Sequence, residues 1–130
     1  MPESIPLLHH TVGWALLLAG FLSGALLGMG FHKDAFLGGY GEFRRRLLRL
    51  GHIACAALGI LNLAYAASPF AAAEGAATWA ASVGLIAGGA LMPTVCFLTA
   101  WKRDFRHLFA LPVIALFTGA CAALVAPHLS

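Results

Sequence analysis

Four long apolar runs divide the chain, at about residues 11–30, 47–67, 77–101 and 108–126. A helix of about 20 apolar residues crosses the hydrocarbon core of a bilayer, so each run is long enough to span a membrane. In lipid, the backbone polar groups must be hydrogen-bonded within a helix or a closed barrel. The pattern predicts an all-α integral membrane protein with four transmembrane helices. Short connections predict antiparallel neighbours in an up-down-up-down bundle.

The composition supports one transmembrane domain over residues 1–130. Hydrophobic residues make up 61% of the chain and charged residues only 10%, against about 25% charged residues in ordinary soluble domains. A chain of this size could not hide that much apolar surface from water. We therefore expect the lipid bilayer to be the main surroundings of the protein.

All eight basic residues lie in two of the three connections or beside them. They are Lys33, Arg44, Arg45, Arg46 and Arg49 after the first run, and Lys102, Arg103 and Arg106 after the third. By the positive-inside rule, both connections face the cytoplasm. The N- and C-termini and the connection with Glu74 then lie on the non-cytoplasmic side. The net charge of +3 thus reflects topology, and we do not expect a nucleic-acid partner.

Small residues recur every four positions in each run. These rows are Gly20, Gly24 and Gly28; Gly51, Cys55 and Gly59; Ala80, Gly84 and Gly88; and Ala115, Gly119 and Ala123. Lipid offers no hydrophobic drive between helices, so close backbone approach must hold the helices together. We expect Gly20, Gly24, Gly28, Gly84 and Gly88 to pack helices within the bundle. Docking against another subunit or a second copy of the chain is the alternative.

The histidines at one end of the runs are candidate cofactor ligands. His52 lies a turn inside the second run, while His32 and His107 flank the first and fourth. A polar ring inside the membrane must find a partner, which predicts a hydrogen bond from His52 to a carbonyl, serine or threonine. Ligation of haem b or a metal by His52 with His107 or His32 is a second hypothesis. A proton or quinone-headgroup role is a third.

The other three histidines are His9, His10 and His128, at the opposite end. A copper or zinc site is conceivable there. Adjacent side chains of a helix point in different directions, however, so His9 and His10 do not converge on one ion. We expect plain interfacial histidines at the mouth of the first run.

Two features interrupt the apolar runs without adding charge. Asn62 is the only amide side chain in any run, and it predicts an interhelical hydrogen bond. Pro93 cannot donate to the carbonyl of Gly89, which predicts a kink in the third helix. Thr94 and Thr99 are candidates to satisfy freed backbone groups. The kink could also open a ligand cavity, as at the broken helices of transporters.

Groups that carry common enzyme or transport chemistry are missing from the runs. All five carboxylates, Glu3, Asp34, Glu42, Glu74 and Asp104, fall outside them, which argues against a small proton-coupled exporter. The pattern shows no Ser-His-Asp arrangement and no paired loop cysteines, and Cys55, Cys96 and Cys121 are expected to be buried, reduced thiols. We therefore do not expect an enzyme.

The segment Gly28 to His32, followed by a histidine early in the second run, resembles a group of small bacterial four-helix membrane proteins. The resemblance covers about a quarter of the chain and assigns no residue a role. We expect a multi-pass protein of the bacterial inner membrane. Three functions remain open: a noncatalytic subunit or assembly factor of a larger membrane complex, such as a respiratory one; a di-histidine haem b protein; and a small dimeric channel or carrier.

Overall fold

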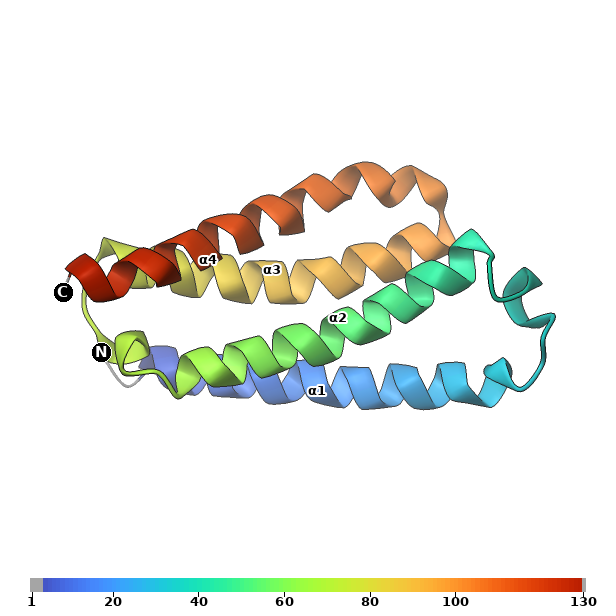
Figure 1. The fold of residues 1–130 in the computed structure, drawn as a ribbon, viewed down its shortest axis with the longest axis horizontal. Helices are drawn as coiled ribbons and strands as arrows, with labels where there is room; N and C mark the ends of the chain where they lie inside the picture. Colours follow the sequence, from blue (N-terminus) through green and yellow to red (C-terminus); the bar gives the residue numbers. More distant parts are fainter. Residues whose placement is uncertain (1–3, 130) are drawn as a thin grey trace.

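The computed structural model describes residues 4–129, and every regular element in that range is a helix (Figure 1). The long helices are α1 (Ser4–Phe31), α2 (Phe43–Ala66), α3 (Ala76–Trp101) and α4 (Ala110–Leu129). Short 3-10 helices lie in the connections: η1 (Phe36–Gly38), η2 (Pro69–Ala72) and η3 (Arg103–Phe109). Four helices, the fourth counted with η3, are long and apolar enough to cross a membrane. The predicted all-helical fold with four helices of membrane-spanning length is confirmed.

The helix boundaries differ from the predicted ones at the starts of three helices. α1 begins at Ser4 instead of residue 11, because its apolar face continues through Ile5 to the histidines. α2 begins at Phe43 instead of residue 47, so residues 44–46 form its first turn. Arginine is a good helix former, and its charge can reach the headgroups from a helix end. α4 begins at Ala110 because η3 occupies the preceding residues.

Each long helix packs mainly against its neighbours in the chain. α1 packs on α2, α2 on α3, and α3 on α4. A smaller contact joins α1 to α3. Figure 1 shows the four helices in this order from bottom to top, with the start of α1 and the end of α4 at the same end of the molecule. α1 and α4 are thus the outermost helices, while α2 and α3 form the middle of the bundle.

Two pairs of glycines allow backbones to approach closely. A Cβ atom built on Gly84 would lie 2.5 Å from the Cα of Gly119, where α3 meets α4. A Cβ on Gly13 would lie 2.9 Å from the carbonyl oxygen of Gly59, where α1 meets α2. Both distances are too short for any side chain. The helix pairs are therefore held by van der Waals contact between backbones, as expected where lipid is the solvent.

The five glycines singled out for packing do not behave alike. Gly20 and Gly24 face α2, and Gly84 and Gly88 face α4. Gly28 is exposed and has no atom within 4 Å of the place where its Cβ would lie. The close contact between α1 and α2 therefore ends before Gly28, because the two helices separate toward the η1 connection (Figure 1).

Candidate functional site

Three polar side chains from three helices meet near the start of α1. The Nδ1 atom of His9 lies 2.7 Å from Oδ1 of Asn62 on α2, and its Nε2 atom lies 2.9 Å from Oγ of Ser82 on α3. His9 and Asn62 are fully buried, and Ser82 is 3% exposed. We call these three residues the histidine clamp, because one imidazole joins α1 to both α2 and α3.

The hydrogen bonds of Asn62 fix the tautomer of the imidazole. The Nδ2 atom of Asn62 donates to the carbonyl of Leu58 at 2.9 Å, which orients the amide so that Oδ1 faces His9. An amide oxygen can only accept, so Nδ1 of His9 carries the hydrogen and donates it. Nε2 then carries the lone pair and accepts from the hydroxyl of Ser82. Both ring nitrogens of a neutral imidazole are satisfied.

Apolar and aromatic groups close the surroundings of the clamp. The ring of Tyr65 lies 4.5 Å from the His9 ring, tilted by 55°. The Tyr65 hydroxyl donates to the carbonyl of Thr78 at 3.4 Å. Tyr65 also belongs to a buried cluster with Ala81 and Leu85. In such a site of low dielectric constant, each hydrogen bond is stronger than in water, and a lost partner costs correspondingly more.

Helix periodicity explains how the three residues come together. The buried positions of α1 are His9, Gly13, Gly20 and Leu27, spaced by four or seven residues along one face. Asn62 follows the buried Gly59 by three residues on α2, and Ser82 precedes the buried Gly89 by seven on α3. Each polar group therefore lies on, or beside, the small-residue face of its helix, where helices approach closely.

The clamp has the order of groups found in hydrolases, namely a hydroxyl, an imidazole and an orienting side chain. The sequence analysis found no Ser-His-Asp arrangement, and the structure places a neutral Asn62 where such a triad has a carboxylate. An amide cannot stabilise an imidazolium charge as a carboxylate does. The Ser82 side chain is also covered by protein. The geometry therefore favours a link between helices over nucleophilic catalysis, with each interhelical hydrogen bond contributing about 0.6–1.7 kcal/mol.

His9 was missed by the sequence analysis, which placed it at the membrane interface. That analysis did not expect a link between helices, whereas α1 begins at Ser4, so His9 lies more than a turn inside the helix on its buried face. Its neighbour His10 is exposed and accepts a hydrogen bond from Nε1 of Trp14 at 3.1 Å. The spacing of His9, four residues before Gly13, is the signal that could have identified it. Among residues 4–129, no group of three or more histidine, cysteine or acidic side chains could hold a metal ion.

His52 makes contacts of the kind expected for a packing residue. Its Nδ1 atom lies 2.8 Å from the carbonyl oxygen of Gly20 and 3.3 Å from the hydroxyl of Ser23, both on α1. His32 and His107 are exposed in the segments that connect the long helices. No hydrogen bond or ring contact within the described chain joins His52 to either of them. The three candidate haem ligands are therefore not brought together by these contacts.

Pro93 is buried, and α3 continues through it without a break. The hydroxyl of Thr94 donates to the carbonyl of Ala90 at 2.7 Å, within the same turn. The hydroxyl of Thr99 is buried without a partner. Pro93 has no N–H to donate to the carbonyl of Gly89. Because Gly89 has no side chain, it leaves room for the Asn62 amide. A Cβ atom built on Gly89 would lie 3.0 Å from Nδ2 of Asn62. Pro93 and Asn62 thus belong to the packed core between α2 and α3.

The described acidic residues lie outside the four long helices and make no hydrogen bond to the clamp. Glu3 falls outside the described residues, and the other four carboxylates lie in the segments between the long helices.

Comparisons of the chain with protein-family models, with curated proteins and with solved structures each gave no match. The interpretation of the clamp therefore rests on its geometry and on the chemistry of its three side chains.

Proposed function

We propose that this chain is a noncatalytic subunit or assembly factor of a larger complex in the bacterial inner membrane. The observation that carries the proposal is the unequal burial of its helices. Half of the most apolar window of α3 is buried within the chain, but only 22% of that of α1 and 11% of that of α4. The outer helices therefore keep most of their apolar surface available to lipid or to other helices.

The polar core supports a structural role. In the histidine clamp, the imidazole, the amide and the hydroxyl bind one another, and His52 binds the backbone of α1. These groups join helices and are already engaged, so none is left poised for a reaction. A bundle that is rigid inside and apolar outside is what a membrane scaffold requires.

The proposed topology follows from the basic residues. They cluster around the α1–α2 and α3–α4 connections, and the positive-inside rule places both connections in the cytoplasm. We infer an up-down-up-down arrangement with both termini on the non-cytoplasmic side. A cysteine-labelling experiment with a membrane-impermeant reagent, at Ala73 and at Lys33, tests this inference. Labelling of Lys33→Cys but not Ala73→Cys in intact spheroplasts would contradict it.

Native mass spectrometry tests the proposed function. The protein is extracted from its own membrane in a mild detergent, and the mass of the intact particle is measured. We expect a particle that contains this chain and at least one different membrane protein in fixed ratio. A monomer under every gentle condition, or a particle made only of copies of this chain, would contradict the proposal.

A photo-crosslinking residue at Phe117 of α4 sharpens the experiment. This side chain is 73% exposed in the isolated chain, so a partner on α4 would lie within reach of the probe. In the native membrane we expect an adduct with the same protein that co-purifies. The matched control is the same variant reconstituted alone in lipid nanodiscs, where only lipid adducts are expected. Lipid adducts alone in both settings would argue against a partner on α4.

A further inference from the structure

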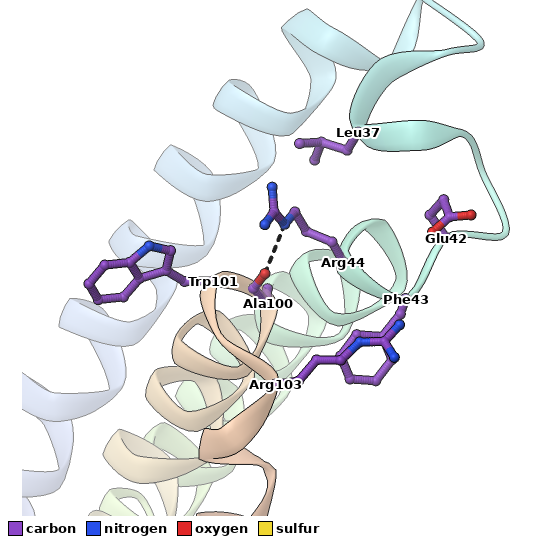
Figure 2. Close-up of a pocket in the computed structure, with 7 residues that line it drawn as sticks. All are labelled: Leu37, Glu42, Phe43, Arg44, Ala100, Trp101 and Arg103. Atoms are coloured by element: carbon purple, nitrogen blue, oxygen red, sulfur yellow. Dashed lines mark hydrogen bonds between the residues drawn. The ribbon is translucent and has the colours of Figure 1, made fainter.

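The end of the molecule opposite the histidine clamp contains a pocket of about 270 Å³ between the start of α2 and the end of α3 (Figure 2). It is lined by Leu37, Glu42, Phe43, Arg44, Ala100, Trp101 and Arg103. The volume lies just below the range of about 300–1,000 Å³ for small-molecule sites, which suits a compact charged group better than a large apolar ligand. We propose that this pocket binds the phosphate of an anionic phospholipid headgroup.

The two arginines of the pocket are held in place without neutralisation by a carboxylate. Nε of Arg44 donates to the carbonyl of Ala100 at 2.9 Å, and Figure 2 shows its guanidinium between that carbonyl and Leu37. Arg103 stacks on the ring of Phe43, 4.4 Å from the ring centre. Ring and carbonyl contacts orient a guanidinium but leave its charge intact.

The outer nitrogens of both guanidinium groups remain available to a ligand. Within residues 4–129, Arg44 makes its hydrogen bond through Nε alone, and Arg103 makes none. The ion pair found in this region joins Lys102 to Asp104 outside the pocket lining, and both side chains are exposed. Guanidinium groups with free forked donors bind phosphate oxygens in a bidentate manner, which makes arginine a common phosphate ligand.

Arg44 also covers a backbone carbonyl that would otherwise repel an anion. The pocket includes the last residues of α3, where unpaired carbonyl groups give a helix its negative end. The hydrogen bond from Arg44 covers the carbonyl of Ala100. The other wall comes from the first turn of α2, which is the positive end of that helix, and its N-cap residue Glu42 makes no side-chain capping hydrogen bond. The remaining field of the walls therefore favours a negative ligand.

One carboxylate in the lining opposes the proposed ligand. Glu42 carries a negative charge, so the lining sums to one net positive charge from two arginines and one glutamate. In Figure 2 the Glu42 side chain points away from Arg44. Removing this charge should strengthen binding of an anion, whereas it should weaken binding of a cation. The sign of that change separates the two classes of ligand.

The position of the pocket favours a lipid as the source of the phosphate. Trp101 is 76% exposed at the rim, and exposed tryptophans at the ends of transmembrane helices lie at headgroup depth. Leu37 holds a left-handed backbone conformation with φ of 54°, which costs a non-glycine residue about 1–2 kcal/mol, and its apolar side chain lies beside the Arg44 guanidinium (Figure 2). Basic pockets between transmembrane helices are a recurrent setting for anionic headgroups.

Quenching of Trp101 fluorescence tests the proposal. The purified protein carries Trp14→Phe and Trp79→Phe, so Trp101 is the reporter, and it is titrated in neutral mixed micelles with acyl-brominated phosphatidylglycerol or phosphatidylcholine. We expect saturable quenching by phosphatidylglycerol at concentrations about tenfold lower than by phosphatidylcholine. Equal quenching by the two lipids would overturn the proposal.

Matched charge variants separate the pocket from a general charge effect. Arg44→Gln with Arg103→Gln removes two pocket charges, and Arg46→Gln with Arg106→Gln removes two exposed charges at the same end. We expect the pocket pair to weaken phosphatidylglycerol binding about tenfold more than the control pair, since it alone loses direct charge-assisted bonds. Equal loss in both would overturn the proposal. Arg103→Gln alone leaves the Arg44–Ala100 contact intact and should still weaken binding, which keeps the test valid if the double variant fails to fold.

Two further measurements identify the ligand. Glu42→Gln should lower the concentration of phosphatidylglycerol needed for half quenching, and an increase would overturn the assignment of an anion site. Millimolar inorganic phosphate distinguishes the sources of the phosphate group. If it leaves the quenching unchanged, the headgroup within its lipid is the ligand. If it displaces the lipid, the anion site stands but the proposed lipid source is wrong.

Discussion

The two ends of the bundle stabilise polar side chains in opposite ways. At the histidine clamp, neutral groups from three helices bind one another and are covered by protein. At the arginine end, which we define as Arg44, Arg45, Arg49 and Arg103, positive groups are held by aromatic rings and backbone carbonyls. The first end is complete within the chain. The second keeps its positive charge, which leaves it able to bind an anion from outside the chain.

Arg45 shows how far the arginine end departs from ordinary pairing. Its side chain is only 4% exposed, its guanidinium lies 4.5 Å from the centre of the Phe31 ring, and its terminal nitrogen donates to the Asp34 backbone carbonyl. The Nε atom is buried without a hydrogen-bond partner. A charge covered in this way is costly unless rings and dipoles compensate for it. Of these two polar ends, the histidine clamp is therefore the one whose hydrogen-bonding groups are satisfied within the chain.

The largest expected effect comes from removing the imidazole of the histidine clamp. His9→Ala deletes two interhelical hydrogen bonds, leaves Oδ1 of Asn62 buried without a donor, and opens a cavity beside Tyr65. We expect a loss of about 2–4 kcal/mol in the free energy of unfolding. Unfolding in mixed micelles with increasing sodium dodecyl sulfate, followed by circular dichroism, measures it.

The matched control is His10→Ala, which removes an exposed imidazole from the adjacent position. Its hydrogen bond is with Trp14 on the same helix, so it joins no helices. We expect a change within about 0.5 kcal/mol. Equal losses in the two variants would show that the clamp is not a special source of stability.

A smaller effect is expected from two glycines of the same helix. Gly13→Ala, one turn after His9, brings a methyl group within 2.9 Å of the Gly59 carbonyl oxygen and should destabilise the protein by about 1–3 kcal/mol. Gly28→Ala adds its methyl group to open space and should stabilise α1 by up to about 1 kcal/mol. The same unfolding measurement applies to both. Destabilisation of the isolated protein by Gly28→Ala would show that this end of α1 packs against α2 after all.

At the arginine end, Arg45→Lys should cost about 1–2 kcal/mol. Lysine keeps the charge but loses the planar group that stacks on Phe31 and donates to the Asp34 carbonyl. Arg46→Lys is the control, because Arg46 is exposed and its side chain makes no hydrogen bond or ring contact within the described chain. Thermal unfolding in detergent, followed by circular dichroism, compares them. If the two variants unfold at the same temperature, the aromatic surroundings of Arg45 contribute nothing to stability.

The four helices of membrane-spanning length could be predicted from the sequence, because 20 consecutive apolar residues have few structural alternatives in water or in lipid. Spacing also identified four packing glycines correctly, whereas Gly28, in the same row, is exposed. The start of α1 could not be placed, because the histidines at residues 9 and 10 are equally compatible with a helix and with an interfacial loop. Only the packing of α2 and α3 decides that one of them is buried and the other exposed.

The candidate site was therefore recovered in part. Asn62 was recognised because a lone amide in an apolar run needs a partner, but nothing along the chain identified that partner as His9. Ser82 lies 73 residues from His9, and an isolated serine in a helix of small residues carries no signal of its own. The arginine pocket was hidden for a related reason. The basic residues near the helix ends predicted which connections face the cytoplasm. The pocket, however, forms only where the start of α2 meets the end of α3, and the sequence does not show that contact.

The smallest expected effect is a change of tautomer within the histidine clamp. In the wild-type protein, nitrogen-15 NMR of labelled histidine, with the His9 signals assigned by comparison with His9→Ala, should show the hydrogen of His9 on Nδ1, because Oδ1 of Asn62 can only accept. Ser82→Ala removes the donor to Nε2, and we expect a loss of about 1 kcal/mol with the tautomer unchanged. Asn62→Leu removes the acceptor instead, so the hydrogen can move to Nε2 and be donated to the hydroxyl of Ser82. A wild-type spectrum with the hydrogen of His9 on Nε2 would mean that the Asn62 amide is turned the other way, and the order of donors in the clamp would have to be reversed.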